Sequence, residues 1–242
     1  MDIGISGSGQ IAAGEYDNIR ISGSGRCSGL VRCVSFHAYG SASGETLECK
    51  NELKVSGSCG FDKDVRCGSL GASGAFSCGG SLTAERKVHC SGGTKVSGNI
   101  KCGELHISGG ITVGGDVEAE MVKVSGKINC EGLLNAEEIK ICSSGNMEIG
   151  TIGGSKVVIY PEHREKWIAR IPFLSSIFHF SSSTVRVKNA IEADTIALEN
   201  VKTPRVSGRI VAIGEDCEID LVQYSEEIEI SPKAKVGRTE KI

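Results

Sequence analysis

The segment Glu52–Gly74 reads ELKVSGSCGFDKDVRCGSLGASG and contains one three-residue phrase twice, as Val55-Ser56-Gly57 and Ala72-Ser73-Gly74. The phrase recurs through the first half of the chain as Ile5-Ser6-Gly7, Ile21-Ser22-Gly23, Ala38-Tyr39-Gly40, Val55-Ser56-Gly57, Ala72-Ser73-Gly74, Cys90-Ser91-Gly92, Ile107-Ser108-Gly109 and Val124-Ser125-Gly126. Successive occurrences lie 16 to 18 residues apart, most often 17. A fixed period of this kind is typical of a repeat architecture, in which each repeat stacks on its neighbours.

Apolar and polar residues alternate just before each phrase. The position next to Ser-Gly holds Ile21, Ala38, Val55, Ala72, Cys90, Ile107, Val124 and Ile141, and the position two residues earlier holds Ile19, Phe36, Leu53, Leu70, Val88, Leu105, Val122 and Ile139. Alternation with a period of two is typical of a strand, and the glycines allow the chain to bend between strands. The sequence therefore predicts an all-β fold, a parallel β-helix with about 17 residues and three short strands per coil.

The position between the two apolar columns predicts an outward basic ladder, made of Arg20, His37, Lys54, His89, His106, Lys123 and Lys140. Stacked coils would bring His89 and His106 together, and protonating both would cost repulsion. Neighbouring carboxylates such as Glu52 and Glu104 offset the positive charge. The ladder is interpreted as a solvated face, with contact to an acidic partner as the alternative.

Most of the eleven cysteines are predicted to be small apolar core residues. No CxxC spacing occurs, and cysteine exchanges with alanine in one column: Cys33, Lys50, Cys67, Ala84, Cys102, Ala119 and Ala136. A buried small hydrophobe behaves in this way. We therefore expect neither a metal site nor a cofactor.

Composition narrows the remaining function classes. The net charge of −3 argues against a general nucleic-acid binder, whose affinity comes largely from phosphate neutralisation. The first residues lack the basic start and apolar run of a secretory signal, and no stretch is long enough for a transmembrane helix. A cytoplasmic protein is the expectation.

The repeat breaks once, at an apolar and aromatic insert in residues 161–183. Pro161 is expected to begin a short helix and Pro172 to end or bend it. The apolar residues of the insert are Trp167, Ile168, Ile171, Phe173, Leu174, Ile177, Phe178 and Phe180. These residues predict an apolar face that binds a membrane surface or a partner. The alternative is that the insert packs over a coil of the β-helix.

The domain organisation follows from this break. Residues 1–160 form the β-helix, residues 161–183 the insert, and residues 184–242 further coils that end in a charged tail expected to fray. The start of the chain shows no polar cap, which monomeric solenoids need. A polymerisation contact is therefore predicted at the first coil, near Ile3, Ile5, Ile11, Ile19 and Ile21.

The order and spacing of the Val-Ser-Gly repeats resemble the bactofilins, bacterial polymer-forming cytoskeletal proteins, over nearly the whole chain. The match looks closest to the longer form found in Firmicutes, which also has stretches like Ile152–Val157 and Ala193–Asn200. The resemblance implies a right-handed β-helix that forms end-to-end filaments without nucleotide, often at the inner face of the membrane. It also implies a role in cell shape, envelope synthesis or flagellum assembly. The expected partner is the chain itself, with a co-assembling paralogue and a membrane surface left open.

The alternative from another class is a hexapeptide-repeat acyltransferase, which has a left-handed β-helix. Ile213–Ile219 and Ile230–Val236 look like isolated hexapeptide turns. Such an enzyme needs several consecutive hexads and a histidine base, whereas most of the chain keeps the period of 17. No acid/base pair or activated nucleophile is evident, and the chain is not expected to be an enzyme.

Overall fold

The computed structural model describes residues 1–161 and 184–242, and all regular secondary structure in these residues is β-strand. The strands are parallel and stack at a spacing of about 17 residues, so the described chain is a parallel β-solenoid, as the repeat predicts. It divides into two compact units, residues 1–120 and 121–242. The expected boundary at residue 160 falls inside the second unit.

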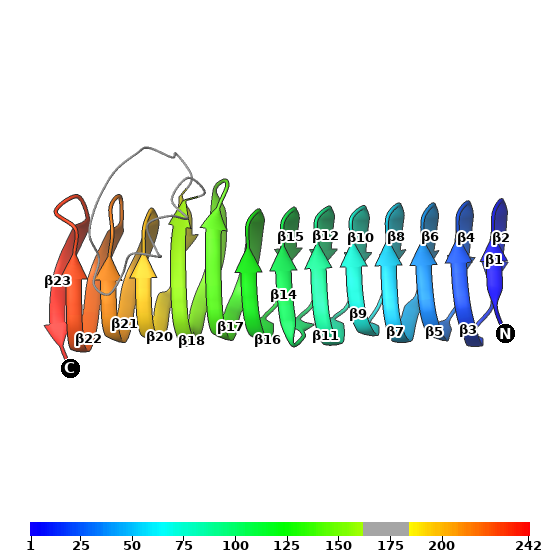
Figure 1. Ribbon diagram of the computed structural model, residues 1–242, viewed down its shortest axis with the longest axis horizontal. Coiled ribbons are helices and arrows are strands. Elements are labelled where there is room, and N and C mark those ends of the chain that lie inside the picture. Colours follow the sequence, from blue (N-terminus) through cyan, green and yellow to red (C-terminus); the bar gives the residue numbers. More distant parts are fainter. Residues whose placement is uncertain (162–183) are drawn as a thin grey trace. The chain divides into compact units, whose positions relative to one another are not determined.

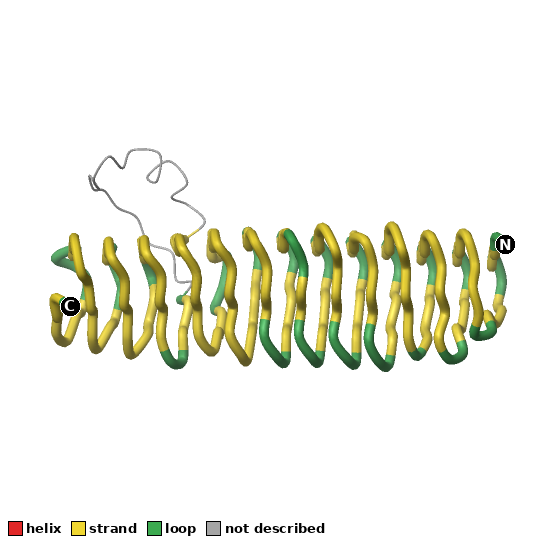
Figure 2. The backbone as a smooth tube through the Cα atoms, turned by 90° about the horizontal axis from the view of Figure 1, so that it is seen from below, coloured by secondary structure: helices red, strands yellow, loops and turns green. Residues whose placement is uncertain are grey.

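The strands of the first unit alternate between short and long over residues 8–96 (Figure 1). They are β1 (Ile3–Ile5), β2 (Ser8–Ile11), β3 (Gly14–Ile21), β4 (Ser24–Cys27), β5 (Leu30–Ala38), β6 (Ser41–Gly44), β7 (Thr46–Val55), β8 (Ser58–Phe61), β9 (Val65–Ala72), β10 (Ala75–Cys78), β11 (Leu82–Cys90), β12 (Gly93–Val96), β13 (Ile100–Lys101), β14 (Glu104–Ile107), β15 (Gly110–Val113) and the first part of β16 (Val117–Val124). Each of β3, β5, β7 and β9 pairs with the next, and the short strands β2, β4, β6, β8 and β10 form their own ladder. Each turn thus contributes one strand to every ladder (Figure 2).

The core follows the predicted alternation. Every residue of the two predicted apolar columns is buried, while the polar positions between them are exposed or half-buried. The core of the first unit is mostly aliphatic, and two of its aromatic residues, Phe36 and Phe61, meet edge to face at 5.8 Å between ring centroids.

The Ser-Gly phrase has a steric cause. A Cβ atom on Gly23 would lie 2.1 Å from the carbonyl oxygen of Gly7, and one on Gly57 would lie 2.0 Å from that of Gly40. The same clash, at 1.9 to 2.3 Å, recurs at Gly40, Gly74, Gly92 and Gly109. These six corners must be glycine because the previous turn's corner lies against each of them.

The second unit contains longer strands. They are the rest of β16, then β17 (Lys127–Ser143), β18 (Met147–Pro161), β19 (Val185–Val187), β20 (Ala190–Leu198), β21 (Val201–Ile213), β22 (Glu218–Ile230) and β23 (Lys235–Lys241). Pro161 is the last residue of β18 and so belongs to the strand, and the helix expected in the insert lies outside the described residues. Proline is tolerated at this strand end because the ladder ends beside it, opposite Ser143. The tail does not fray, since β23 pairs with β22 from Glu218↔Lys235 to Tyr224↔Lys241.

All eleven cysteines are buried, as predicted for core residues. The predicted column is wrong at one position, however. Lys50 is exposed, and Cys49 occupies the stacked position between Cys33 and Cys67. The error arises because the register shifts after Cys33 and again after Cys49, which a fixed period of 17 does not anticipate.

Candidate functional site

The first turn presents a strand edge. β1 pairs with β3, with Ile3 opposite Ile19 and Ile5 opposite Ile21, and β2 pairs with β4. No described strand pairs with the other edge of β1 or β2. An unpaired edge offers backbone donors and acceptors to a further strand.

The five isoleucines predicted at this edge fall into two groups. Ile3 and Ile5 are half-buried, whereas Ile11, Ile19 and Ile21 are no more than 2% exposed. Ile19 and Ile21 belong to the second turn, where they pair in register with Ile3 and Ile5. The surface available for contact is therefore Ile3 and Ile5 with the free backbone of β1 and β2.

Gly7 is the exception in the corner ladder. A Cβ atom on Gly7 would meet nothing within 4 Å, although the next six corners would all clash. Its φ angle is not positive, so its backbone does not require glycine either. Within the described chain, the first corner keeps glycine without a steric reason.

The last turn ends some inward columns with apolar residues and another with a polar residue. Ile228 and Ile230 follow Val211 and Ile213 in register, and Ile230 is 37% exposed. On another side of the turn, the polar Thr239 follows the buried Val222, and Lys241 follows the half-buried Tyr224. A polar residue at an inward position resembles the cap that keeps solenoids soluble.

The predicted outward ladder is distributed over both units. In the first unit, Arg20, His37, Lys54, Gly71, His89 and His106 are consecutive register partners. Glu52 lies 3.5 Å from the Nε2 atom of His37, and Glu104 lies 3.3 Å from that of His106. In the second unit Lys123 is exposed, and the ammonium of Lys140 lies 5.6 Å from the centre of the Tyr160 ring. A carboxylate or an aromatic ring thus lies close to several of the ladder's side chains.

An apolar cluster replaces the ladder in the second unit. Cys142, Val158 and Tyr160 alternate with the inward residues Ile141 and Ile159, yet all three are at most 9% exposed. The half-buried Ala197 contacts this cluster, opposite Val158 in the next turn. The sequence signal was present, because Val158 and Ala197 occupy the column that holds basic residues elsewhere.

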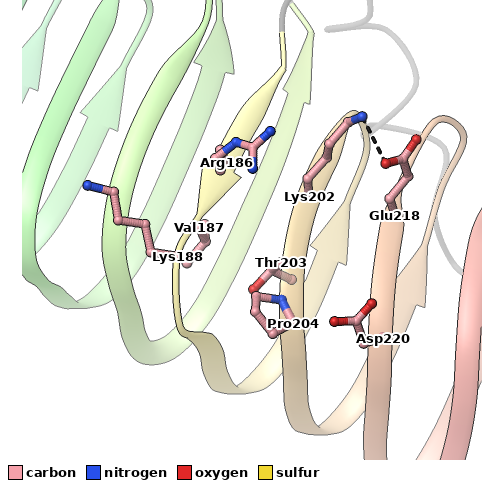
Figure 3. Close-up of a pocket in the computed structure, with 8 residues that line it drawn as sticks. All are labelled: Arg186, Val187, Lys188, Lys202, Thr203, Pro204, Glu218 and Asp220. Carbon is pink, nitrogen blue, oxygen red and sulfur yellow. Dashed lines mark ion pairs between the residues drawn. The ribbon is translucent and has the colours of Figure 1, made fainter.

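A shallow groove of about 410 Å³ crosses three turns of the second unit (Figure 3). Its lining residues are Arg186, Val187, Lys188, Lys202, Thr203, Pro204, Glu218 and Asp220. The ammonium of Lys202 lies 2.8 Å from Glu218, whereas Arg186 has no ion-pair partner among the described residues. The groove holds charges of both signs and does not bring a nucleophile next to a base.

The predicted insert residues Trp167, Ile168, Ile171, Phe173, Leu174, Ile177, Phe178 and Phe180 lie outside the described residues. Among the residues that are described, no helix has the length and apolar character needed to cross a membrane. No group of three or more His, Cys, Asp or Glu side chains within residues 1–161 and 184–242 is placed to hold a metal ion.

Comparison with known proteins gives one short match. Over 52 residues, the chain is 42% identical to the uncharacterized protein YhbE of Bacillus subtilis (strain 168). The match covers 22% of this chain and 22% of that protein. No family model and no solved structure matches the chain.

Proposed function

We propose that this chain is a bacterial scaffold protein of the bactofilin type, which polymerises end to end without nucleotide. The first turn is the polymerisation contact. The role is structural rather than catalytic, in the cytoplasm or at the inner face of the cell membrane, and serves cell shape, envelope or flagellum assembly.

The observation that carries this proposal is the open edge of β1. Ile3 and Ile5 begin two inward columns that are apolar through every following turn of the first unit, and they remain half-buried at the edge. A further strand on this edge would complete backbone hydrogen bonds and cover both side chains. The repeat order that resembles bactofilins supports the same reading.

Gly7 supports a stacked contact of the kind found inside the solenoid. At each later corner, glycine is needed because a carbonyl of the preceding turn approaches it. A second copy that stacked on β1 and β2 in the same manner would place its own carbonyl beside Gly7. In that contact a Cβ atom at position 7 would clash with the carbonyl, so glycine would be required there as it is at the later corners.

Negative-stain microscopy and sedimentation of the purified protein without nucleotide test this function. Filaments or large assemblies are expected. Gly7→Ala should weaken assembly and leave the urea unfolding midpoint unchanged, because none of the described residues lies within 4 Å of the new methyl group. A strictly monomeric protein at high concentration, in both low and moderate salt, would rule the proposal out.

Membrane association is a separate part of the proposal and rests on the composition of the insert. Liposome flotation of the full chain against a variant that lacks residues 162–180 tests it. The full chain is expected to float with the vesicles and the shortened chain to remain below. Equal flotation would remove the membrane from the proposed function and leave polymerisation untouched.

A further inference from the structure

Three cysteines stack in consecutive turns of the first unit. Cys33 lies opposite Cys49, and Cys49 lies opposite Cys67. By contrast, Cys59 lies between Ala42 and Phe76 in its own ladder. Paired strands are about 4.8 Å apart, which falls within the range of Cα separations that a disulfide spans.

The stacked thiols lie where the ladder is irregular. The register shifts directly after Cys33 and directly after Cys49, as the chain passes from one side of the coil to the next. The Cys49 thiol donates hydrogen bonds to the carbonyl oxygens of Val34, at 3.5 Å, and Glu52, at 3.1 Å.

A surface groove reaches these thiols. It has a volume of about 390 Å³ and is lined by the three cysteines together with the cationic side chains of Arg32, Lys50 and Arg66 and the residues Glu48, Thr83 and Glu85. The cysteines are only 3% to 6% exposed, so a small reagent fits this approach better than a protein does.

The pKa values of the two thiols shift in opposite directions. A hydrogen bond from the Cys33 thiol lowers the pKa of Cys49, and the same bond together with burial raises the pKa of Cys33. Burial raises the pKa of Cys59, Cys67 and Cys102 to about 12. Because the thiolate is the reactive form, Cys49 is the preferred nucleophile of the group.

We infer that Cys33 and Cys49 form an oxidisable dithiol, which hydrogen peroxide closes into a disulfide between adjacent turns. The Cys49 thiolate attacks one peroxide oxygen, the O–O bond breaks, and Cys49 becomes a sulfenic acid while hydroxide leaves. The sulfur of Cys33 then displaces the sulfenic hydroxyl, and its proton leaves with that oxygen as water. The two sulfurs lose two electrons in total and the peroxide gains them.

The disulfide should be readily reversible. Side chains in register on parallel strands start farther apart than the Cβ separation of about 3.8 Å that a relaxed disulfide prefers. Closing that gap strains the bond, and strained disulfides are the more easily reduced ones. A mild thiol reductant is therefore expected to restore both cysteines.

Peptide mass mapping tests the pair directly, because cleavage after Arg32 and Lys50 leaves both cysteines in the single peptide Cys33–Lys50. After peroxide treatment of the folded protein and blocking of free thiols, this peptide is expected to be unblocked and lighter by two hydrogen atoms. The peptide Cys67–Arg86, which also holds two cysteines, serves as the internal control and should stay fully blocked. The cross-link should form at least about tenfold faster than any oxidation of Cys59.

Matched variants separate the pair from the rest of the column. Cys49→Ala should abolish the cross-link, and Cys67→Ala should leave it intact, with the β-sheet circular dichroism of both variants checked first. A cross-link between Cys49 and Cys67, overoxidation of Cys49 without a cross-link, or no selective reaction in the folded protein would each overturn the assignment.

Discussion

The first turn and the last turn end their inward columns with different side chains. At the first turn, Ile3 and Ile5 are apolar at the free edge, and Gly7 leaves the corner open. At the last turn, Ile228 and Ile230 end one pair of columns, and the exposed Thr239 of the charged strand β23 follows the buried Val222 on another side.

The difference shows how a repeat can terminate without changing its backbone. Both turns end in parallel strands, so each presents a backbone edge with which no described strand pairs. The side chains in the inward columns decide whether an edge invites another strand or resists it. The first turn therefore presents Ile3 and Ile5 for contact, and the last turn presents Ile228 and Ile230 on one side and a partial polar cap at Thr239 on another.

The largest effect is expected from charging the open edge. Ile5→Arg should abolish assembly, because a guanidinium in the inward column would be buried without a partner in any stacked contact. Sedimentation velocity over a range of concentrations measures the loss. Gln10→Arg, which adds the same charge at an exposed position of β2, is the control and should still assemble. Assembly of Ile5→Arg at the wild-type concentration would contradict the role of this edge.

Next in size is the effect of filling an internal corner. Gly57→Ala should destabilise the fold by roughly 2 kcal/mol or more, because its Cβ atom would lie 2.0 Å from the carbonyl oxygen of Gly40. Urea unfolding measures the change. Gly7→Ala makes the same substitution at the edge and should unfold like the wild type, so equal destabilisation of both variants would show that the first corner is not open.

A smaller effect is expected from removing a charge from the edge of the last turn. Lys241→Leu should lower the concentration needed for association by about threefold, because an apolar side chain would then follow Tyr224 at that edge. Light scattering against concentration measures the shift. Lys235→Leu makes the same change at a highly exposed position that pairs with Glu218, and it should have less effect. An equal effect of both variants would deny that Lys241 acts as a cap.

The smallest effect concerns the ion pairs beside the cap. Hydrogen bonds from Lys202 and Lys235 lower the pKa of Glu218 below its ordinary value. A carboxyl group with a lowered pKa in the folded state stabilises above its unfolded pKa, and that contribution is lost as the pH falls through the lowered pKa. Glu218→Gln should therefore reduce the urea midpoint slightly at neutral pH and not at strongly acidic pH. A midpoint difference that persists in acid would indicate a cause other than charge.

Much of the fold could be read from the sequence because its physics is local and repetitive. The alternation around Leu53 and Val55 gives a strand with one buried face, and the period of 17 gives the stacking. The cysteines could be placed in the core for the same reason. The edge residues Ile3 and Ile5 followed from extending the columns to the first turn.

Other features could be found only from the folded structure. The position of Cys49 depends on irregularities in the ladder, and such irregularities arise from how each corner fits the turn beneath it rather than from any local signal. The sequence pattern did not predict the strand that ends at Pro161 or the paired strand β23. Proline and clustered charge suggest the end of regular structure when the strands that pair with them are not known. Tyr160 stands out as a buried outward residue only when its accessibility is known.

The sequence by itself determined that this protein is a stack of short parallel strands with a small-residue core, because side-chain alternation and spacing are properties of the chain. Only the tertiary structure decided why each corner is glycine and which corner is open, because that depends on the distance from Gly23 to Gly7 and on the empty space beyond Gly7. It likewise decided that Cys33 and Cys49 are neighbours, since contact across turns is set by register and not by separation along the chain.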